Sequence, residues 1–236
     1  MRVGIVGAGK MGKEIAGVAR AQGHEVVWTF SSDENRGSEG LTPVRLAEVD
    51  VVFEFTAPGA AVGNLLALAA AGSRVVCGTT GWSEELPRVS EAFRRGGGAL
   101  VYATNFSIGM RHFVEVARAA ASLFPRAGYA SFLVEEHHAG KRDAPSGTAR
   151  TLADAVEKES GARPPVASVR AGTVPGLHRL VFESPEDEVE LIHRARGRAG
   201  FAKGAVWAAE RIAGRSGVFE FGELLKAGFG EGRTRH

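Results

Sequence analysis

A short run near the middle of the chain holds a dense group of side chains able to move protons. From Glu135 to Thr148 the sequence reads EEHHAGKRDAPSGT, which brings together His137, His138 and Lys141. Histidine and lysine both deliver protons near neutral pH when their surroundings adjust their pKa values. We therefore expect acid–base chemistry in this run.

The end of the same run predicts an anion site. Ser146 is suited to cap a helix that begins at Gly147, and the amides of Gly147 and Thr148 would then point outward. Outward amides at a helix N-terminus bind carboxylate or phosphate groups. The alternatives are a solvated charged loop and a metal site at the paired histidines. Neighbouring residues on a strand point to opposite faces and rarely chelate one ion, so we expect no metal.

A glycine-rich turn near the N-terminus predicts dinucleotide binding. It follows an apolar run, opens a helical pattern, and consists of Gly7, Ala8, Gly9, Lys10, Met11 and Gly12. In such a turn the first glycine permits a sharp bend and the second lets the backbone approach a pyrophosphate. The third allows close packing of helix and strand. The alternative is a glycine-rich turn without a ligand.

The residues after the second apolar run bear on the choice between NADH and NADPH. Where NAD-specific folds place an acidic residue, this chain has Ser31 and Ser32, with Arg36 nearby. Hydroxyl groups do not repel a 2′-phosphate, which favours acceptance of NADPH. The alternative is that Asp33 or Glu34 binds the ribose and NADH works equally well.

Two later loops are candidates for the nicotinamide end of the cofactor. Gly78, Thr79 and Thr80 follow a predicted strand and can contact a carboxamide, although an ordinary turn is the alternative. In the second loop, the Phe106 ring can stack on a nicotinamide or pack in the core. The other residues of that loop are Ala103, Thr104 and Asn105.

These motifs resemble the 4-hydroxy-tetrahydrodipicolinate reductase family, formerly called dihydrodipicolinate reductase. The most specific match is HHxxKxDAPSGTA, from His137 to Ala149. The weaker matches occur in the family's order and span nearly the whole chain. They are the fingerprint at Gly7, FTxP at Phe55, GTTG at Gly78, AxNFS at Ala103, RxGxVPGxH at Arg170 and FAxGA at Phe201.

The resemblance implies an enzyme that reduces a cyclic unsaturated dicarboxylate with NADPH or NADH in the diaminopimelate route to lysine. It makes His137 the catalytic proton donor and acceptor and Lys141 a second proton donor. The implied substrate contacts are His138, Ser146, Gly147 and Thr148, and the implied cofactor contacts run from Gly7 to Gly12, Gly78 to Thr80 and Ala103 to Phe106. It also implies a homotetramer formed by pairing the open sheets of the second domains.

The first hundred residues must position the nucleotide motifs. Short apolar runs alternate with helical patterns, which is typical of a Rossmann-type parallel sheet with helices on both faces. The polar stretch 33–40 is predicted to be a mobile loop. The predicted strands are Arg2–Val6, Glu25–Phe30, Val51–Phe55, Arg74–Cys77 and Ala99–Tyr102, and the predicted helices are Lys10–Gln22, Gly59–Ala71 and Glu84–Arg95.

After Asn105 the pattern changes to blocks of helices and strands, which predicts a smaller α+β domain. The run Glu188–Arg196 alternates apolar and polar residues, as expected for a mixed sheet open on one side. We assign residues 1–105 and 213–236 to a dinucleotide-binding domain and residues 106–212 to a substrate-binding and oligomerisation domain. The other predicted elements of the second domain are helices at 109–124, 147–159 and 201–213 and extended runs at 166–170 and 179–183.

Composition narrows the class of protein. Of 236 residues 32 are glycine, about 14% against the usual ~7%, yet no three-residue period suggests collagen. A net charge of +2 without a basic stripe argues against nucleic-acid binding, and no apolar run is long enough to span a membrane. The single cysteine, Cys77, fits the cytosol, and we expect it to be buried rather than nucleophilic.

Three other functions are compatible with parts of the pattern. One is a different two-domain NAD(P)-dependent dehydrogenase acting on an amino acid or a sugar acid. Another is a regulator that senses NAD without catalysis, and the third is a homologue that performs dehydration or isomerisation. Among the isolated histidines, His178 and His193 are the best candidates for lining a pocket.

Overall fold

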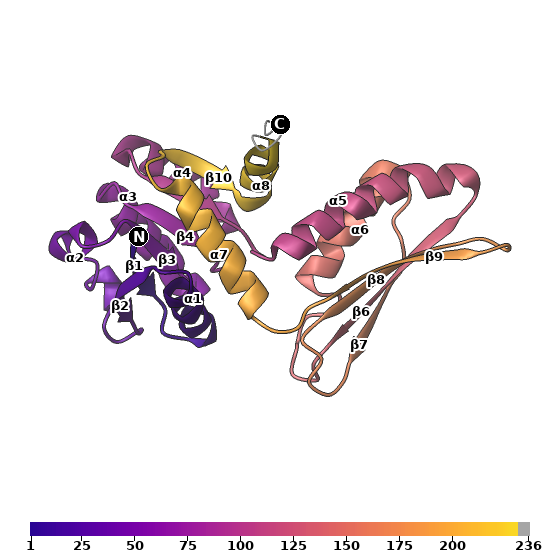
Figure 1. The fold of residues 1–236 in the computed structure, drawn as a ribbon, viewed down its shortest axis with the longest axis horizontal. Helices are drawn as coiled ribbons and strands as arrows, with labels where there is room; N and C mark the ends of the chain where they lie inside the picture. Colours follow the sequence, from indigo (N-terminus) through magenta and orange to yellow (C-terminus); the bar gives the residue numbers. More distant parts are fainter. Residues whose placement is uncertain (231–236) are drawn as a thin grey trace. The chain divides into compact units, whose positions relative to one another are not determined.

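The computed structural model describes residues 1–230, which form two compact units. Unit 1 combines residues 1–107 with the C-terminal segment that starts at Phe201, and unit 2 runs without interruption from Ile108 to Gly200. Each unit has its own sheet (Figure 1), and each is described by itself. Residues 231–236 of the predicted C-terminal return lie outside the described residues.

Unit 1 is organised around a sheet of six parallel strands, sheet A, in the order β10-β5-β4-β3-β1-β2. Its central strands are largely apolar and almost fully buried because both faces of the sheet are covered, as is usual for parallel sheets. The predicted Rossmann-type sheet is confirmed. The strands are β1 (Arg2–Val6), β2 (Glu25–Phe30), β3 (Val51–Glu54), β4 (Arg74–Cys77), β5 (Ala99–Tyr102) and β10 (Gly217–Glu220).

Helices cover both faces of sheet A. On one face, Leu65 and Phe93 pack against Val52 and Val75 of the sheet. On the other face, helices α1 and α7 lie near one another (Figure 1), and His24 Nε2 lies 3.2 Å from Glu210 Oε1. The helices of unit 1 are α1 (Lys10–Ala21), α2 (Pro43–Ala47), α3 (Pro58–Ala70), α4 (Leu86–Gly96), α7 (Ala199–Ile212) and α8 (Phe221–Gly230), with 3-10 turns η1 (Arg36–Ser38) and η2 (Ser83–Glu85).

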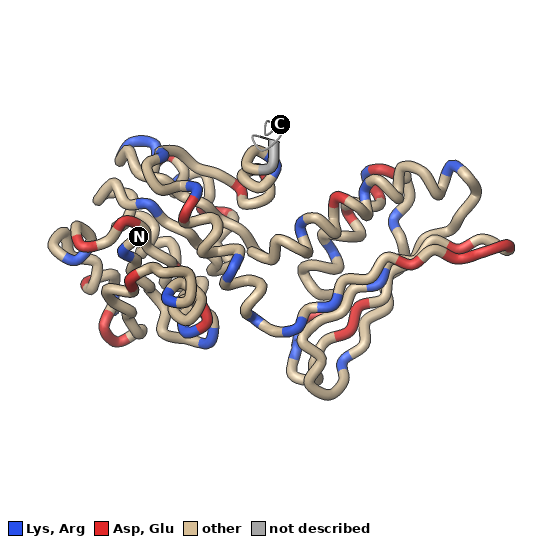
Figure 2. The backbone as a smooth tube through the Cα atoms, viewed as in Figure 1, with Lys and Arg blue, Asp and Glu red and all other residues tan. Residues whose placement is uncertain are grey.

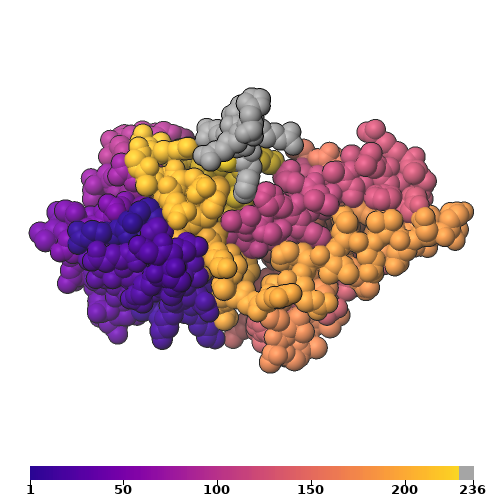
Figure 3. All heavy atoms as spheres, in the orientation of Figure 1, coloured from indigo at the N-terminus to yellow at the C-terminus, as the bar shows by residue number. Residues whose placement is uncertain are grey.

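Helix α7 is grouped with unit 1, whereas the sequence placed residues up to 212 in the second domain. The reason is close packing. A Cβ added at Gly204 would lie only 1.7 Å from the carbonyl oxygen of Phe106, so the helix backbone rests directly on this segment of unit 1. The indigo N-terminal and yellow C-terminal segments of unit 1 also adjoin on its surface (Figure 3).

The stretch 33–40, predicted to be a mobile loop, is tied to the rest of unit 1. Asn35 is buried and donates a hydrogen bond from Nδ2 to Asn64 Oδ1 at 2.8 Å. Ser38 Oγ donates to the same oxygen at 2.9 Å, and the Gly40 amide donates to Asn35 Oδ1 at 3.1 Å. The polar composition that suggested a loose loop instead supplies this network.

Unit 2 contains a mixed four-stranded sheet, sheet B, in the order β7-β6-β8-β9. Strand β6 pairs in parallel with β7 and antiparallel with β8, which in turn pairs antiparallel with β9. The predicted mixed sheet is confirmed. The elements are α5 (Ile108–Leu123), η3 (Phe124–Ala127), β6 (Ala130–His137), α6 (Gly147–Ser160), β7 (Val166–Arg170), β8 (Leu177–Glu183) and β9 (Glu188–Arg194).

Both long helices of unit 2, α5 and α6, lie on one side of sheet B (Figure 1). Leu133 and Leu180 of the sheet are fully buried in the cluster that these helices form. Strand β9 alternates between partly buried and exposed residues, as predicted. On its exposed side Ile192 is 51% exposed, and on β7 Val169 is 45% exposed.

Basic and acidic residues are distributed differently along the described chain. Lys and Arg are dispersed over both units, and acidic residues gather at the tip of the β8–β9 hairpin (Figure 2). Within residues 1–230, no helix is both long and apolar enough to cross a membrane.

Candidate active site

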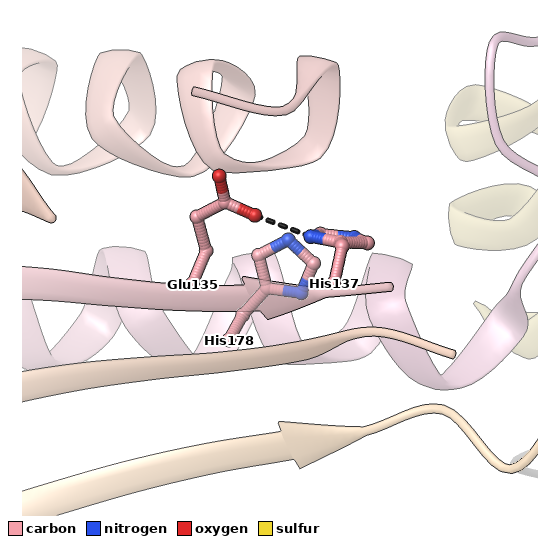
Figure 4. Close-up of side chains that lie close together, drawn as sticks. All are labelled: Glu135, His137 and His178. Atoms are coloured by element: carbon pink, nitrogen blue, oxygen red, sulfur yellow. Dashed lines mark hydrogen bonds and ion pairs between the residues drawn. The ribbon is translucent and has the colours of Figure 1, made fainter. Parts of the chain in front are cut away.

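Strand geometry places Glu135 and His137 on the same side of sheet B. Successive side chains of a strand point to opposite faces, so residues two apart share a face. His178 stands opposite Glu135 in the antiparallel register of β6 and β8. Figure 4 shows the three side chains converging, and the rings of His137 and His178 meet edge to face with centroids 5.3 Å apart.

Glu135 is the centre of a buried hydrogen-bond network. Its side chain is fully buried, and its Oε2 is hydrogen-bonded to His137 Nδ1. Its Oε1 accepts hydrogen bonds from Arg170 Nη2 at 2.6 Å and from the Ser146 amide at 3.2 Å. A carboxylate held by cationic and backbone donors in this way can stay charged without water.

The network shifts the pKa values of its members. Burial alone would raise the pKa of Glu135, but hydrogen bonds from Arg170, Ser168 and the Ser146 amide outweigh burial and lower it to about 2. Burial lowers the pKa of His137, and the neighbouring Glu135 carboxylate offsets part of that effect. Burial and the adjacent His137 lower the pKa of His178 to about 4.

Ser146 caps α6, as predicted, and joins the helix to the histidines. Its Oγ accepts a hydrogen bond from the Ala149 amide at 3.1 Å and lies 3.2 Å from His178 Nε2. His178, one of the two isolated histidines considered as pocket residues, is therefore part of the cluster. Nδ1 of His178 is buried and makes no hydrogen bond within residues 1–230.

Asp143 lies at the predicted anion site. Lys141 Nζ is 2.7 Å from Asp143 Oδ1, and this contact is the main cause that lowers the pKa of Asp143, with the nearby Gly147 amide as a minor one. The Gly147 amide, predicted to be open to a substrate, thus lies near a carboxylate of the protein itself. Thr148 follows it in the first turn of α6.

His138 is separated from His137. It follows the last residue of β6 and is exposed, whereas His137 is only 9% exposed. Glu135, His137 and His178 each offer one possible metal ligand, and these three atoms lie within 4.8 Å of one another. This group differs from the adjacent pair His137 and His138, for which the sequence predicted no shared ion. The guanidinium of Arg170, bound to the same carboxylate, opposes a metal cation there.

The glycine-rich turn lies at a cavity of about 470 Å³ in unit 1. Gly7 has φ +115°, and a Cβ there would lie 2.1 Å from the Phe55 carbonyl oxygen, so glycine is required. A Cβ at Gly12 would lie 1.8 Å from the Gly7 carbonyl oxygen, as expected for close helix packing. Five predicted cofactor residues line this cavity: Gly7, Ala8, Gly9, Ser31 and Ser32. Lys10, Met11 and Gly12 begin α1 just beyond it.

Glu34 accepts hydrogen bonds from the donors that follow the end of β2. Its Oε2 accepts hydrogen bonds from the Ser31 amide and from Ser31 Oγ, both at 2.8 Å, and these bonds lower the pKa of Glu34. Arg36 lines the same cavity and its Nη2 lies 3.8 Å from Asp33 Oδ1. Both an acidic and a basic side chain are therefore present where the sequence left the choice of cofactor open.

The two candidate nicotinamide loops meet at a smaller cavity of about 130 Å³. Its lining includes Thr79, Thr80, Ala103 and Thr104, together with Trp82. Gly78 lies below the loop, where a Cβ would be 2.1 Å from the Phe55 ring.

Phe106 is 2% exposed and packs against Phe55 and Phe221. Its ring therefore belongs to the core, in agreement with the packing alternative. Asn105 Oδ1 accepts a hydrogen bond from the Ser107 amide at 2.7 Å.

Sequence reasoning named the motif residue Glu135 without giving it a role. The available signal was its spacing of two from His137 on an extended segment, which places both on one face. Arg170 was named only as the start of a weaker family match, since only the parallel pairing of β6 and β7 sets it opposite His137. In unit 1 the missed residue was Glu54, a fully buried carboxyl group at the end of an apolar strand.

Comparisons with known proteins agree with this architecture. Residues 1–106 match the family model described as "Dihydrodipicolinate reductase, N-terminus", and residues 109–225 match "Dihydrodipicolinate reductase, C-terminus". The chain is 32% identical to the 4-hydroxy-tetrahydrodipicolinate reductase of Christiangramia forsetii, covering 95% of this chain and 98% of the relative. It is 36% identical to that of Natronomonas pharaonis, over 95% and 100% respectively.

Solved structures share the fold. The dipicolinate-bound dihydrodipicolinate reductase of Paenisporosarcina sp. TG-14 superposes with a TM-score of 0.77 at 24% identity, covering 93% of this chain and 97% of the other. The DAP dehydrogenase of C. glutamicum has a TM-score of 0.58 at 14% identity over 99% of both chains. The fold of this chain is therefore also found in a dehydrogenase of another name.

Proposed function

This chain belongs to the dihydrodipicolinate reductase family, and we propose that unit 1 binds the nicotinamide dinucleotide while unit 2 binds and protonates the substrate. The chain is an NAD(P)H-dependent oxidoreductase with the activity of its named relatives, 4-hydroxy-tetrahydrodipicolinate reduction. That activity fits a role in the synthesis of diaminopimelate and lysine.

The main support for these roles is the buried cluster of Glu135, His137 and His178 beside the N-terminus of α6. His137 and Lys141 are the catalytic acids in this proposal. Hydride addition to a conjugated C=C–C=N system places negative charge on the ring, and a nearby cationic acid stabilises that charge and then protonates carbon. Burial keeps water from competing for the proton.

A dicarboxylate substrate fits the charges of unit 2. One carboxylate would displace Asp143 from Lys141 Nζ and the Gly147 amide, since the two oxyanions need the same donors. His138, Ser146 and Thr148 are the further predicted contacts. A dipicolinate ligand, itself a planar dicarboxylate, is reported for the Paenisporosarcina neighbour and supports this substrate class.

The dinucleotide supplies the hydride when it is bound. The backbone of Gly7 to Gly9 suits a pyrophosphate, because a side chain at Gly7 would clash with the Phe55 carbonyl. Ser31 and Ser32 would contact the adenosine ribose, with Thr79, Thr80, Ala103 and Thr104 toward the nicotinamide. We propose that both NADH and NADPH are accepted, since Glu34 suits a ribose hydroxyl and Arg36 suits a 2′-phosphate.

We also propose a homotetramer in which the open faces of sheet B pair between chains. The exposed Val169 and Ile192 support this, since helices cover only the other face. The mass of the native particle, by light scattering or native mass spectrometry, tests it. A monomer at micromolar concentration would contradict the tetramer and leave the catalytic assignment untouched. The cytosolic location stays a prediction.

The decisive test of function is a pair of initial-rate curves, with NADH and with NADPH, on enzymatically generated substrate. We expect oxidation of both nucleotides that depends on the cyclic dicarboxylate. Absence of oxidation with either nucleotide would refute the proposal. A screen of amino acids and sugar acids addresses the dehydrogenase alternative, and product analysis without nucleotide addresses dehydration or isomerisation.

A further inference from the structure

We propose that Glu135 is a positioning residue, which fixes the imidazole of His137 with its proton on Nδ1 and thereby presents Nε2 to the substrate. This inference rests on the proposed role of His137 as the catalytic acid. Glu135 does not itself contact the reacting atoms in this proposal.

Glu135 and His137 form a direct hydrogen-bonded pair. Oε2 of Glu135 is hydrogen-bonded to Nδ1 of His137, and a carboxylate at that position accepts a hydrogen bond rather than donating one. The hydrogen bond at one ring nitrogen decides which tautomer is present and how the ring is oriented. Nε2 makes no hydrogen bond to any of residues 1–230, so it is the nitrogen available for proton transfer.

The carboxylate of Glu135 is itself held in place. Arg170 Nη2 binds Oε1 at 2.6 Å and also donates to the Asp143 carbonyl at 2.6 Å. The Ser146 amide binds Oε1 as well. With Oε1 fixed by two donors from different segments, rotation of Glu135 would break both bonds, and Oε2 remains directed at His137.

The backbone leaves space beside Nε2 of His137. Gly176 has φ +150°, and a Cβ at this position would lie 3.1 Å from His137 Nε2. A side chain there would crowd the nitrogen that the substrate must reach. The ring is supported from another direction by His178, whose buried imidazole meets it edge to face.

The charges around His137 determine how its proton affinity responds to Glu135. Burial lowers the pKa of His137, as do Lys141 and Arg170, whereas Glu135 raises it. His178 is the other titratable group against the ring, and its pKa of about 4 leaves it neutral near pH 7. Among these groups, Glu135 is therefore the one that favours the protonated form of His137.

The test variant is Glu135→Gln, which keeps the shape and one acceptor oxygen but removes the charge. We expect kcat to fall about 10- to 100-fold with the KM for the nucleotide unchanged. Because the acid must be protonated, activity declines as pH rises through its pKa. Loss of the carboxylate lowers that pKa, so the basic limb of the profile of kcat/KM should move to lower pH.

The matched control is Glu54→Gln, the same change at the fully buried carboxyl group of unit 1. Its side chain accepts hydrogen bonds from Thr56, Asn64 and Cys77, all residues of unit 1. We expect the basic limb of Glu54→Gln to coincide with that of the original protein, whatever happens to its KM for the nucleotide.

A second readout does not depend on activity. The ¹⁵N shifts of the His137 ring report the tautomer and titration directly, and we expect the Nδ1–H form in the original protein and in Glu54→Gln. In Glu135→Gln the ring should titrate at lower pH. Unchanged titration and an unmoved basic limb in Glu135→Gln would overturn the proposal.

Glu135→Asp covers the case in which Glu135→Gln does not fold. It keeps the charge but shortens the side chain, so we expect kcat to fall about tenfold, with a mixture of tautomers at His137. Unchanged kcat with a single Nδ1–H tautomer would overturn the proposal. Lack of NAD(P)H oxidation by the original protein would instead refute the proposed function, because the tautomer measurement would still stand.

Discussion

Among the described residues, each unit buries one carboxyl group completely, Glu54 at the end of β3 and Glu135 in β6, but their partners differ. Glu54 accepts hydrogen bonds from the neutral groups Thr56 Oγ1, Asn64 Nδ2 and Cys77 Sγ. Burial raises the pKa of the Cys77 thiol well above its usual value, so the thiol remains a donor. Glu135 binds Arg170 and a histidine that can become charged.

This difference separates two uses of a buried acid. In unit 1 the hydrogen bonds link β3, β4 and α3, and through Asn64 they reach Asn35 at the cavity beside the glycine-rich turn. They hold together the elements beside this cavity. In unit 2 the charge of the acid acts on another titratable group, His137, and raises its pKa against the effect of burial.

The largest effect should come from the acids of unit 2. We predict that His137→Ala and Lys141→Ala each lower kcat about 100-fold or more while nucleotide binding is retained, since only proton delivery is lost. Steady-state kinetics and nucleotide binding by fluorescence measure the two quantities. Near-normal kcat in either variant would remove that residue from the mechanism and weaken the contrast between the units.

The next effect concerns stability and pH. His178 takes up a proton at about pH 4 in the folded protein but near 6.5 when unfolded. The contribution of His178 to the free energy of unfolding is therefore complete above pH 6.5 and is lost as the pH falls toward 4. We predict that unit 2 loses about 2 kcal/mol between pH 7 and pH 5, measured by hydrogen exchange of unit 2 peptides.

Glu135 adds to this trend only at lower pH, because its pKa changes from about 4.5 to about 2 on folding. The control is His178→Gln, which keeps a hydrogen-bonding group near Ser146 but does not titrate. Its unit 2 peptides should lose less protection over the same interval. Equal loss in both proteins would show that other groups cause the pH dependence.

A smaller effect is expected from Glu34, which binds Ser31 of the unit 1 cavity. Glu34→Gln removes a negative charge that binds the Ser31 donors, so the ratio of kcat/KM for NADPH to that for NADH should rise up to about fivefold. Glu39→Gln makes the same change of charge on an exposed residue of the same segment and is the matched control. An equal change in both variants would point to the general charge of unit 1.

The smallest effect is expected at Glu54. In Glu54→Gln one oxygen still accepts hydrogen bonds from Thr56 and Asn64, and only the weak hydrogen bond from Cys77 is lost. The free energy of unfolding should therefore change by less than ~1 kcal/mol. Urea unfolding of Glu54→Gln and Glu135→Gln compares the two sites. A loss at Glu54 as large as that at Glu135 would mean that charge does not distinguish the two acids.

The alternating part of the fold was predictable because its signals are local. Apolar runs of four to six residues predicted β1, β2, β4 and β5 with their observed bounds. The short helix α2 was missed, since five residues that begin with proline show no periodicity. The membership of α7 in unit 1 depends on the contact of Gly204 with Phe106, residues far apart in the sequence, and no local pattern records it.

The site was predictable to the level of its motif but not of its partners. The sequence indicated Ser146 as a cap and His137 as an acid, and the structure places both around Glu135. The contacts of Arg170 and His178 arise from strand pairing and could not be derived from spacing along the chain. The same holds for Asp143 at the Gly147 amide, where the polar loop folds back onto its own helix.

The position of β10 has a consequence for the order in which the chain is made. Sheet A is completed at one edge by residues 217–220, which pair with β5 at residues 99–102. All of unit 2 leaves the ribosome between these two strands, so the insert can fold while one edge of β5 still has no neighbour. An apolar edge strand can recruit other chains, and newly made protein is therefore exposed to aggregation at β5 until its last strand has been synthesised.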